Sequence, residues 1–114
     1  MVPRRGQLFR LKSDAVGKQR IVVIVSRTEL NAGLSVIAIP FYSSQFETRK
    51  NEDFCAEFAQ DEGGLTKDCV AKTDQINLIL KSELELSRGS IGSFDESQML
   101  RLLDALKWTL KIDS

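Results

Sequence analysis

An unbroken apolar run from Ile21 to Val25 constrains the fold of this chain more than any other stretch. The run is rich in β-branched side chains, and Gly17 precedes it while the polar Ser26 follows it. A short β-branched run with such boundaries is typical of a strand that is buried on both faces. We therefore expect a central strand over residues 20–26 of a sheet.

Arg20 is the last polar residue before this run, so a rigid strand would hold its side chain at the end of the sheet. The planar guanidinium of an arginine in that position can bind a phosphate through two hydrogen bonds. The alternative is an ordinary arginine at a strand end that points into solvent. The charge distribution and the neighbouring motifs help to decide between a phosphate-binding arginine and a solvent-exposed one.

Composition limits the classes of protein to consider. A chain of 114 residues with 42% hydrophobic residues can form one domain, residues 1–114, around a core of its own. No apolar stretch approaches the ~20 residues of a membrane span, and the N-terminus lacks the apolar segment of a signal peptide. These features predict a soluble, cytoplasmic protein with no membrane contact.

Histidine is absent from the sequence, which excludes histidine bases, histidine metal ligands and histidine-based triads. Cys55 and Cys69 are too few and too isolated for a disulfide scaffold or a four-ligand zinc site. We expect both to be small core residues, and we expect neither a metal nor a cofactor.

The net charge is zero, but the charges are distributed unevenly along the chain. Residues 1–27 contain seven basic residues against Asp14 alone, whereas residues 28–63 contain seven acidic residues against Arg49 and Lys50. A basic face on a neutral chain suits a polyanion such as nucleic acid. The acidic segment could instead fold over the basic one and neutralise it.

Periodicity and turn residues predict the remaining elements before the C-terminal helix. They are a strand over 7–12 with Phe9 and Leu11 on one face, a loop over 13–19, a helical turn or loop over 28–33, a strand over 34–41 closed by Pro40, a mobile loop over 47–52, a strand over 54–58, a turn over 61–64, and an extended segment over 69–76. Residues 78–86 fit a strand or a helix equally. Lys72 and Asp74 are two residues apart, so an extended segment would place them on the same side.

The C-terminal segment has the pattern of an amphipathic helix. Ser93 and Glu96 form the expected capping box, in which each side chain binds a free backbone amide of the first turn. The apolar stripe is expected to consist of Met99, Leu103, Leu106 and Leu110, with Leu102 alongside. Leu100 and Trp108 lie off the stripe, which indicates either a partner subunit or scattered apolar surface residues.

About five strands followed by one such helix predict a mainly β fold, a small, strongly curved β-barrel with a C-terminal amphipathic helix. The chain also carries, in order, R-R-G-x-L-F, R-I-V-V-I-V-S, N-x-x-L-S-V-I-A-I-P-x-x-S-S-Q, G-G-L-T-K-D-C-V-A-K-T-D-Q-I and G-S-I-G-S-F-D-E-S-Q-M-L-R-L-L-D-A-L. In order and spacing these motifs resemble the MazF/PemK (Kid-like) toxin family of type II toxin–antitoxin systems.

The resemblance implies an SH3-like barrel and a homodimer that partners a cognate antitoxin protein. It also implies a metal-independent endoribonuclease, an mRNA interferase that cuts single-stranded RNA and inhibits growth. Cleavage in this family leaves a 2′,3′-cyclic phosphate and a 5′-hydroxyl.

By the same resemblance, the catalytic residues are Arg20, Ser43 and Asp74. The implied RNA-binding residues are Lys72, Gln75, Ser44 and Gln45, and Lys18 is expected to replace part of a phosphate contact that the short loop before Arg20 loses. Attack by the 2′-hydroxyl needs a base, a proton for the leaving oxygen and positive charge near the phosphorane. Without histidine, Asp74 is the natural candidate for the base, although it could instead form a salt bridge with Lys72 or Arg20.

The sequence departs from the family pattern around Arg20. Ile21 stands where the family usually has proline, and the preceding loop, 16–19, is short and lacks a Gly-(Ser/His)-Glu element. Two other functions remain: a CcdB-like toxin that binds gyrase, or a catalytically inactive relative that acts by protein binding. Arg20, Ser43 and Asp74 favour the nuclease.

Overall fold

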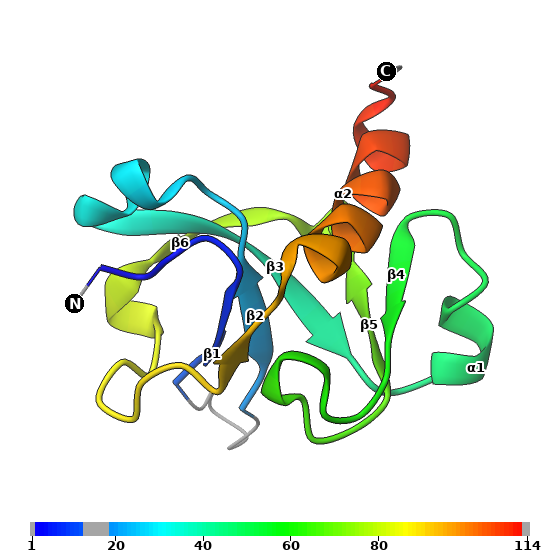
Figure 1. Cartoon of the computed structure of the whole chain (residues 1–114), viewed down its shortest axis with the longest axis horizontal. Helices are drawn as coiled ribbons and strands as arrows, with labels where there is room; N and C mark the ends of the chain where they lie inside the picture. Colours follow the sequence, from blue (N-terminus) through cyan, green and yellow to red (C-terminus); the bar gives the residue numbers. More distant parts are fainter. Residues whose placement is uncertain (1, 13–18, 113–114) are drawn as a thin grey trace.

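The computed structural model describes residues 2–12 and 19–112, and its main feature is an antiparallel sheet. Its strands are β1 (Gln7–Arg10), β2 (Ile21–Ile24), β3 (Ser35–Tyr42), β4 (Cys55–Phe58), β5 (Cys69–Lys72), β6 (Asn77–Leu80) and β7 (Gly92–Ser93). The order across the sheet is β4-β5-β3-β2-β1-β7, and β6 pairs with β3 outside this path. Figure 1 shows the strands curving around one another, with a helix, α2 (Glu96–Leu110), packed against one side.

The central strand is confirmed as β2, which lies between β1 and β3 and is buried on both faces. Val23 is aligned with Leu8 on one side and Ile39 on the other, and all three belong to one hydrophobic core. Val22 and Ile24 point the opposite way into a second core. Because both faces are covered, the strand contains no polar residue between Arg20 and Ser26.

The second core fills a small barrel that the chain closes through backbone hydrogen bonds. Leu11 bridges to Leu84, with the Lys12 amide bound to the Glu83 carbonyl at 2.8 Å and the Glu85 amide bound to the Arg10 carbonyl at 2.8 Å. The buried residues inside are Phe9, Val22, Ile24, Val36, Ala38, Ile79 and Leu84. Leu11 packs against this core on the same side as Phe9, as the alternation predicts. The mainly β fold with a C-terminal helix is confirmed, and residues 2–12 and 19–112 contain seven strands rather than the expected five or so.

The first core lies between the other face of the sheet and α2. Three phenylalanine rings meet there: Phe58 stacks on Phe94 with centroids 4.4 Å apart, and Phe41 meets both rings edge-on at 5.9–6.0 Å. Leu102 of α2 is fully buried against them. Aromatic pairs in these arrangements stabilise the fold by more than the burial of their apolar area alone would.

The helix begins two residues later than the sequence predicts. Ser93 is taken up by β7, where it pairs with Gln7, so Asp95 becomes the N-cap. The Asp95 carboxylate accepts from the Gln98 amide at 2.8 Å, and the Gln98 side chain accepts from the Asp95 amide at 2.7 Å. A capping box therefore exists, but Asp95 and Gln98 form it instead of Ser93 and Glu96.

The buried face of α2 is also rotated from the expected stripe. Its buried residues are Met99, Leu102 and Ala105, while Leu110 is 51% exposed. The buried face thus includes the small Ala105, a feature that an apolar stripe of large residues does not reveal. Leu100 and Trp108 are exposed, as expected for residues off the packed face.

Two predicted segment boundaries before β4 are wrong. Pro40 does not close its strand, because β3 continues to Tyr42. Pro40 lies between the ladder that β3 forms with β6, which ends at Ala38, and the one that it forms with β5, which begins at Phe41. The expected loop over 47–52 begins as a one-turn helix, α1 (Phe46–Arg49), which lies beyond β4 and β5 in Figure 1.

The prediction of an extended segment over 69–76 is correct for its first half only. β5 ends at Lys72, and the chain then turns into a 3-10 helix, η3 (Thr73–Gln75). Thr73 is buried, and its hydroxyl donates to the Phe54 carbonyl at 2.7 Å, which anchors this turn. Lys72 and Asp74 are therefore not on one side of a strand. The ambiguous stretch that follows divides into β6 and another 3-10 helix, η4 (Lys81–Glu83).

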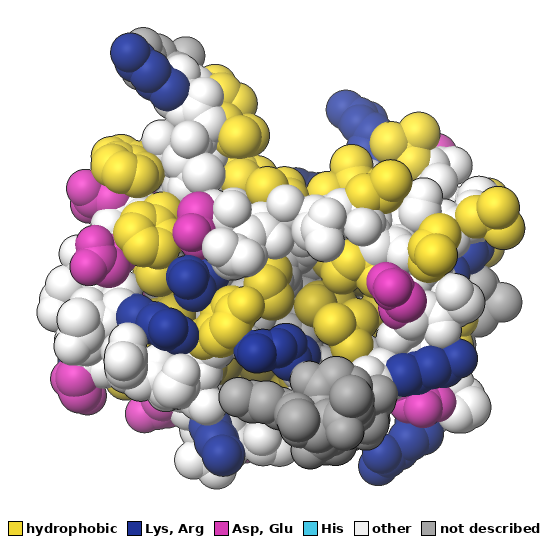
Figure 2. Space-filling view, turned by 180° about the vertical axis from the view of Figure 1, so that it is seen from behind, with side chains coloured by type: hydrophobic (Ala, Val, Ile, Leu, Met, Phe, Trp, Pro, Cys, Tyr) yellow, Lys and Arg dark blue, Asp and Glu magenta, His cyan; other side chains and the backbone are white. Residues whose placement is uncertain are grey.

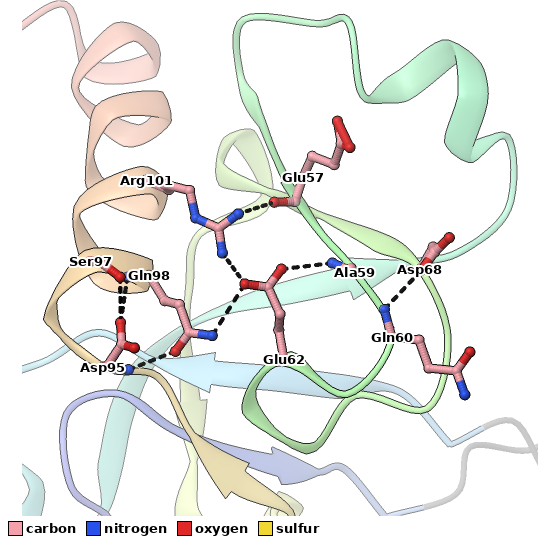
Figure 3. A network of polar contacts seen from close by, with 9 residues as sticks. All are labelled: Glu57, Ala59, Gln60, Glu62, Asp68, Asp95, Ser97, Gln98 and Arg101. Carbon is pink, nitrogen blue, oxygen red and sulfur yellow. Dashed lines mark hydrogen bonds and ion pairs between the residues drawn. The ribbon is translucent and has the colours of Figure 1, made fainter.

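A polar clamp joins the turn after β4 to the start of α2 (Figure 3). Glu62, in the short 3-10 helix η2 (Glu62–Gly64), accepts from the Ala59 amide at 2.8 Å, from Gln98 at 3.2 Å and from Arg101. The backbone beside it is tightly packed, since a Cβ on Gly92 would lie 2.2 Å from the Gly63 carbonyl oxygen. Within residues 2–12 and 19–112, no helix has the length and apolar character needed to cross a membrane.

Candidate active site

Arg20 lies directly before β2, where the barrel backbone holds it in place. Its carbonyl accepts from the Leu11 amide at 2.7 Å, which continues the pairing between β1 and β2. Its side chain is half-buried, and the guanidinium carbon lies 4.8 Å from the centre of the Tyr42 ring. The arginine is therefore stacked on an aromatic ring and does not extend alone into solvent.

Arg20 and Ser43 line the same pocket, a cavity of about 320 Å³ at the end of β2 and β3. Its lining combines apolar and polar side chains. The apolar ones are the buried Phe41, Leu65 and Cys69 with the partly buried Ile21, and the polar ones, besides Arg20 and Tyr42, are Gln19, Ser43, Ser44, Thr66 and Lys67. An apolar lining with a few polar groups is the usual character of a ligand site.

Three cations converge on Tyr42. Besides Arg20, the Lys72 ammonium lies 5.1 Å and the Arg49 guanidinium carbon 5.2 Å from the ring centre. The register explains part of this arrangement: Tyr42 is aligned with Val70, and Lys72 follows two residues later on the same face of β5. Arg49 comes from α1, and its Nη1 also lies 3.4 Å from the Ser44 hydroxyl. We call Arg20, Tyr42, Arg49 and Lys72 the Tyr42 cluster.

The cluster lacks carboxylate partners within the described part of the chain. The ion pairs found there are Lys50–Glu47 and Arg101–Glu62, and neither includes a residue of the cluster. The acidic segment therefore does not neutralise Arg20 through an ion pair. Figure 2, seen from behind the view of Figure 1, shows Lys and Arg side chains standing among hydrophobic ones on that face.

Asp74 and Gln75 lie outside the lining of the pocket, in η3. Both are exposed, and the Gln75 amide donates to the Asp74 carboxylate at 3.3 Å. Among the described residues, Asp74 forms no ion pair with Lys72 or Arg20, the alternative that the sequence left open. Gln45 is exposed at the start of α1 with a left-handed backbone, φ 55°. Lys18 and most of the loop over 13–19 lie outside the described residues.

Both cysteines are buried and free, which confirms them as core residues. Burial, reinforced by the charges of Asp68 and Glu62, raises the pKa of the Cys69 thiol to about 12. Burial also raises the pKa of Cys55, with Asp74 adding to the shift and Lys72 opposing it. In residues 2–12 and 19–112, His, Cys, Asp and Glu side chains form no group of three that could hold a metal ion.

The structure thus brings Arg20, Ser43, Ser44 and Lys72 to one end of the sheet. It also adds Tyr42, Arg49, Thr66 and Lys67, which the sequence did not single out. Tyr42 could have been found, because it precedes Ser43 directly and is the sole tyrosine of the chain. Arg49 could not, since its position depends on α1 folding back toward β5.

The pocket and the neighbouring cations lie together at the strand ends of the barrel. They define a candidate binding site for an anionic ligand. The sequence profile of one family, described as PemK-like, MazF-like toxin of type II toxin–antitoxin system, matches residues 4–110. The chain belongs to this family. No curated protein matches the sequence significantly.

Solved structures with this fold include members of the same toxin class. An endoribonuclease from a mycobacterial species, in complex with its cognate antitoxin, is similar with a TM-score of 0.76 and 24% identity, over 98% of each chain. The Mycobacterium tuberculosis toxin MazF-mt6 is similar with a TM-score of 0.75 and 20% identity, over 95% of this chain and 99% of the toxin. MazE–MazF from Deinococcus radiodurans (Form-II) is similar with a TM-score of 0.74 and 18% identity, over 99% of each chain.

Proposed function

We propose that this chain is a metal-independent endoribonuclease that cuts single-stranded RNA, including mRNA, and thereby inhibits translation and growth. The observation that carries the proposal is that Arg20 and Ser43 line one pocket, beside further cations, in a member of the MazF-like toxin family. Similar structures include proteins described as endoribonucleases. The absence of histidine from the whole sequence leaves the chemistry to Arg, Lys, Ser and Asp side chains.

The reaction is an internal transfer at phosphorus. The ribose 2′-oxygen attacks the adjacent phosphorus, the bond from phosphorus to the 5′-oxygen breaks, and a 2′,3′-cyclic phosphate and a 5′-hydroxyl result. The proton of the 2′-hydroxyl passes to a base, and the leaving 5′-oxygen takes up a proton. Negative charge grows on the phosphorane oxygens, so fixed cations and hydrogen-bond donors there lower the barrier.

Within this scheme, Arg20 binds the scissile phosphate through its planar fork and stabilises the phosphorane. Ser43 donates a hydrogen bond to a phosphate oxygen from the same pocket. Asp74 is proposed as the base, with its carboxylate at the exposed turn that follows Lys72. This role requires the RNA to run from the pocket across Lys72 to η3.

The RNA strand is proposed to contact Lys72 and Gln75 on one side and Ser44 and Gln45 on the other, with Lys18 adding a further contact. Contacts of this kind to phosphate and sugar position a strand, and cations among them supply a salt-dependent share of the affinity.

We also propose that the chain acts as a single toxin domain, residues 1–114, in the cytoplasm. Its expected partners are a cognate antitoxin protein and a second copy of the chain. The mycobacterial endoribonuclease and the Deinococcus MazF are both found with antitoxins. The exposed Leu100 and Trp108 of α2 supply apolar surface for assembly.

The deciding experiment incubates the purified chain with single-stranded RNA in excess chelator, next to a DNA gyrase supercoiling assay. Cleavage with cyclic-phosphate ends supports the proposal. Cleavage that stops in chelator and returns with a divalent ion overturns the metal-independent mechanism. Gyrase inhibition without RNA cleavage would identify a CcdB-like toxin, and neither activity would identify an inactive relative that acts by protein binding.

A further inference from the structure

The Tyr42 cluster concentrates more positive charge than one catalytic arginine requires. Its three cations lie 4.8 Å, 5.1 Å and 5.2 Å from the centre of one ring, so no two of them are more than about 10 Å apart. That separation is comparable to the Debye length at physiological salt, ~8 Å, so the three charges act on a ligand together.

These cations come from three separate segments of the chain: the residue before β2, the end of β5, and α1. Like charges repel, and three flexible side chains would spread into solvent without something to gather them. The face of an aromatic ring attracts cations through its quadrupole. Tyr42 is half-buried in β3, between β2 and β5, so its ring is fixed where all three side chains can reach it.

The charge of the cluster is not used within the described chain. Neither ion pair found there includes Arg20, Arg49 or Lys72, and within the described residues the Arg49 side chain donates one hydrogen bond, to the neutral Ser44 hydroxyl at 3.4 Å. An anion with several acceptor oxygens is the ligand that such a group lacks. Along an RNA strand, successive phosphates offer such anions.

We propose that Tyr42 is a positioning residue that gathers Arg20, Arg49 and Lys72 into one subsite for two neighbouring phosphates of the RNA. Arg20 holds the scissile phosphate, while Arg49 and Lys72 hold the next phosphate along the strand. This inference rests on the proposed nuclease function, but it assigns new roles to Tyr42 and Arg49. It predicts that RNA affinity depends on the aromatic ring of Tyr42 and not on its hydroxyl.

Binding is measured with an RNA whose 2′-hydroxyls are all O-methylated, which cannot be cleaved, so affinity is separated from chemistry. Tyr42→Leu keeps apolar bulk but removes the aromatic face, and it should weaken binding about tenfold. Tyr42→Phe should restore most of that loss. Arg49→Ala removes a half-buried side chain from the one-turn helix α1, and it should lower the slope of log affinity against log salt by about 0.7.

A spectroscopic readout reports on the wild-type site directly. Since Tyr42 is the sole tyrosine, 3-fluorotyrosine labelling gives a single ¹⁹F resonance from the cluster. That resonance should shift when the methylated RNA is added. Lys107→Ala, an exposed change on α2, is the matched control and should leave the resonance, the affinity and the salt slope unchanged.

The outcomes separate the inference from the proposed function. If the wild type binds and cleaves RNA while Tyr42→Leu and Arg49→Ala match it in affinity and salt slope, the subsite is overturned and the nuclease stands. If the wild type binds the methylated RNA with the expected variant effects but cleaves no RNA, the subsite stands and the nuclease fails. If Tyr42→Phe keeps its affinity but loses its cleavage rate, the hydroxyl acts in the chemistry and the positioning role is wrong.

Discussion

Arg20 and Arg101 occupy similar local settings but have different partners. Each guanidinium stacks on an aromatic ring, Arg20 at 4.8 Å from the centre of Tyr42 and Arg101 at 4.6 Å from the centre of Phe58. Arg101 also donates to Glu62 and to the Glu57 carbonyl, as Figure 3 shows. In the described part of the chain, Arg20 forms no ion pair.

This difference is what we expect between an arginine with a structural role and one that binds an anionic ligand, the role that we propose for Arg20. Arg101 has a carboxylate that its own fold supplies, and the pair ties η2 to α2. Arg20 shares its ring with Arg49 and Lys72, which makes the site more positive instead of neutral. Stacking alone therefore does not distinguish the two arginines, whereas the presence or absence of a carboxylate does.

The largest expected effect comes from Arg20. Arg20→Ala should lower RNA cleavage by at least about 10²- to 10³-fold, because it removes the fixed donors at the phosphorane. Lysine at the same position should not restore the rate, since a point charge cannot reproduce the two-pronged contact. Single-turnover cleavage of a labelled RNA measures both variants. A lysine variant with wild-type activity would show that charge alone is sufficient.

Asp74→Asn tests the assignment of the base. The amide cannot take up the 2′-hydroxyl proton, so the cleavage rate should fall by about 10²-fold or more. Cleavage rates of the wild type and of Asp74→Asn, measured across pH, show whether Asp74 acts as the base. If the variant cuts RNA at the wild-type rate while Arg20→Ala is inactive, Asp74 is not the base and catalysis rests on Arg20.

Ser43→Ala removes the hydrogen bond that we propose Ser43 donates to a charged phosphate. That bond is expected to contribute roughly 1–3 kcal/mol, so cleavage should slow by about ten- to a hundredfold. Ser90→Ala, a serine remote in sequence from the site, is the control in the same kinetic assay. Equal rates for the two variants would remove Ser43 from the proposed site.

Arg101→Ala should affect stability instead of chemistry. It deprives Glu62 of its ion-pair partner, and because both side chains are partly exposed the loss should be about 1 kcal/mol, or about 4 °C in Tm. Thermal unfolding followed by circular dichroism measures the shift. An unchanged Tm would mean that Ala59 and Gln98 suffice to hold the clamp.

The smallest effect is the pH dependence of the clamp. Burial would raise the pKa of Glu62, but hydrogen bonds from Ala59, Gln98 and Arg101 outweigh it and lower the pKa. A lowered folded-state pKa stabilises the protein above the unfolded value, about 4.3, and this contribution is lost as the pH falls through the folded value. In urea unfolding, Glu62→Gln should be less stable than the wild type at pH 7, with the gap narrowing toward pH 3. A constant gap would contradict the linkage.

The sequence predicted those parts of the fold that depend on local pattern. The run after Arg20 defined β2, because burial on both faces leaves a continuous apolar signature. The capping box was misplaced because Ser93 and Asp95 are both good caps, and only the pairing of Ser93 with Gln7 decides between them. Such long-range pairing is invisible to a local pattern.

The same reasoning applies to the candidate site. Arg20 could be singled out from local pattern because it lies next to a strong strand signal, whereas Ser43 was predicted from the family resemblance, and the two line one pocket. The Tyr42 cluster was missed because its members approach one another only after β3, β5 and α1 are in place. Asp74 was expected to lie beside Lys72 on a strand, but the buried Thr73 turns the chain between them.

The comparison of the two arginines is tested most directly by measuring cleavage rate and Tm on the same preparations of Arg20→Ala and Arg101→Ala, with single-stranded RNA in excess chelator. We expect Arg20→Ala to lose cleavage and keep the wild-type Tm, whereas Arg101→Ala should keep cleavage and lose about 4 °C in Tm. If Arg20→Ala still cuts RNA, or loses activity only because it unfolds, Arg20 is not held ready for the phosphate and the central claim is wrong.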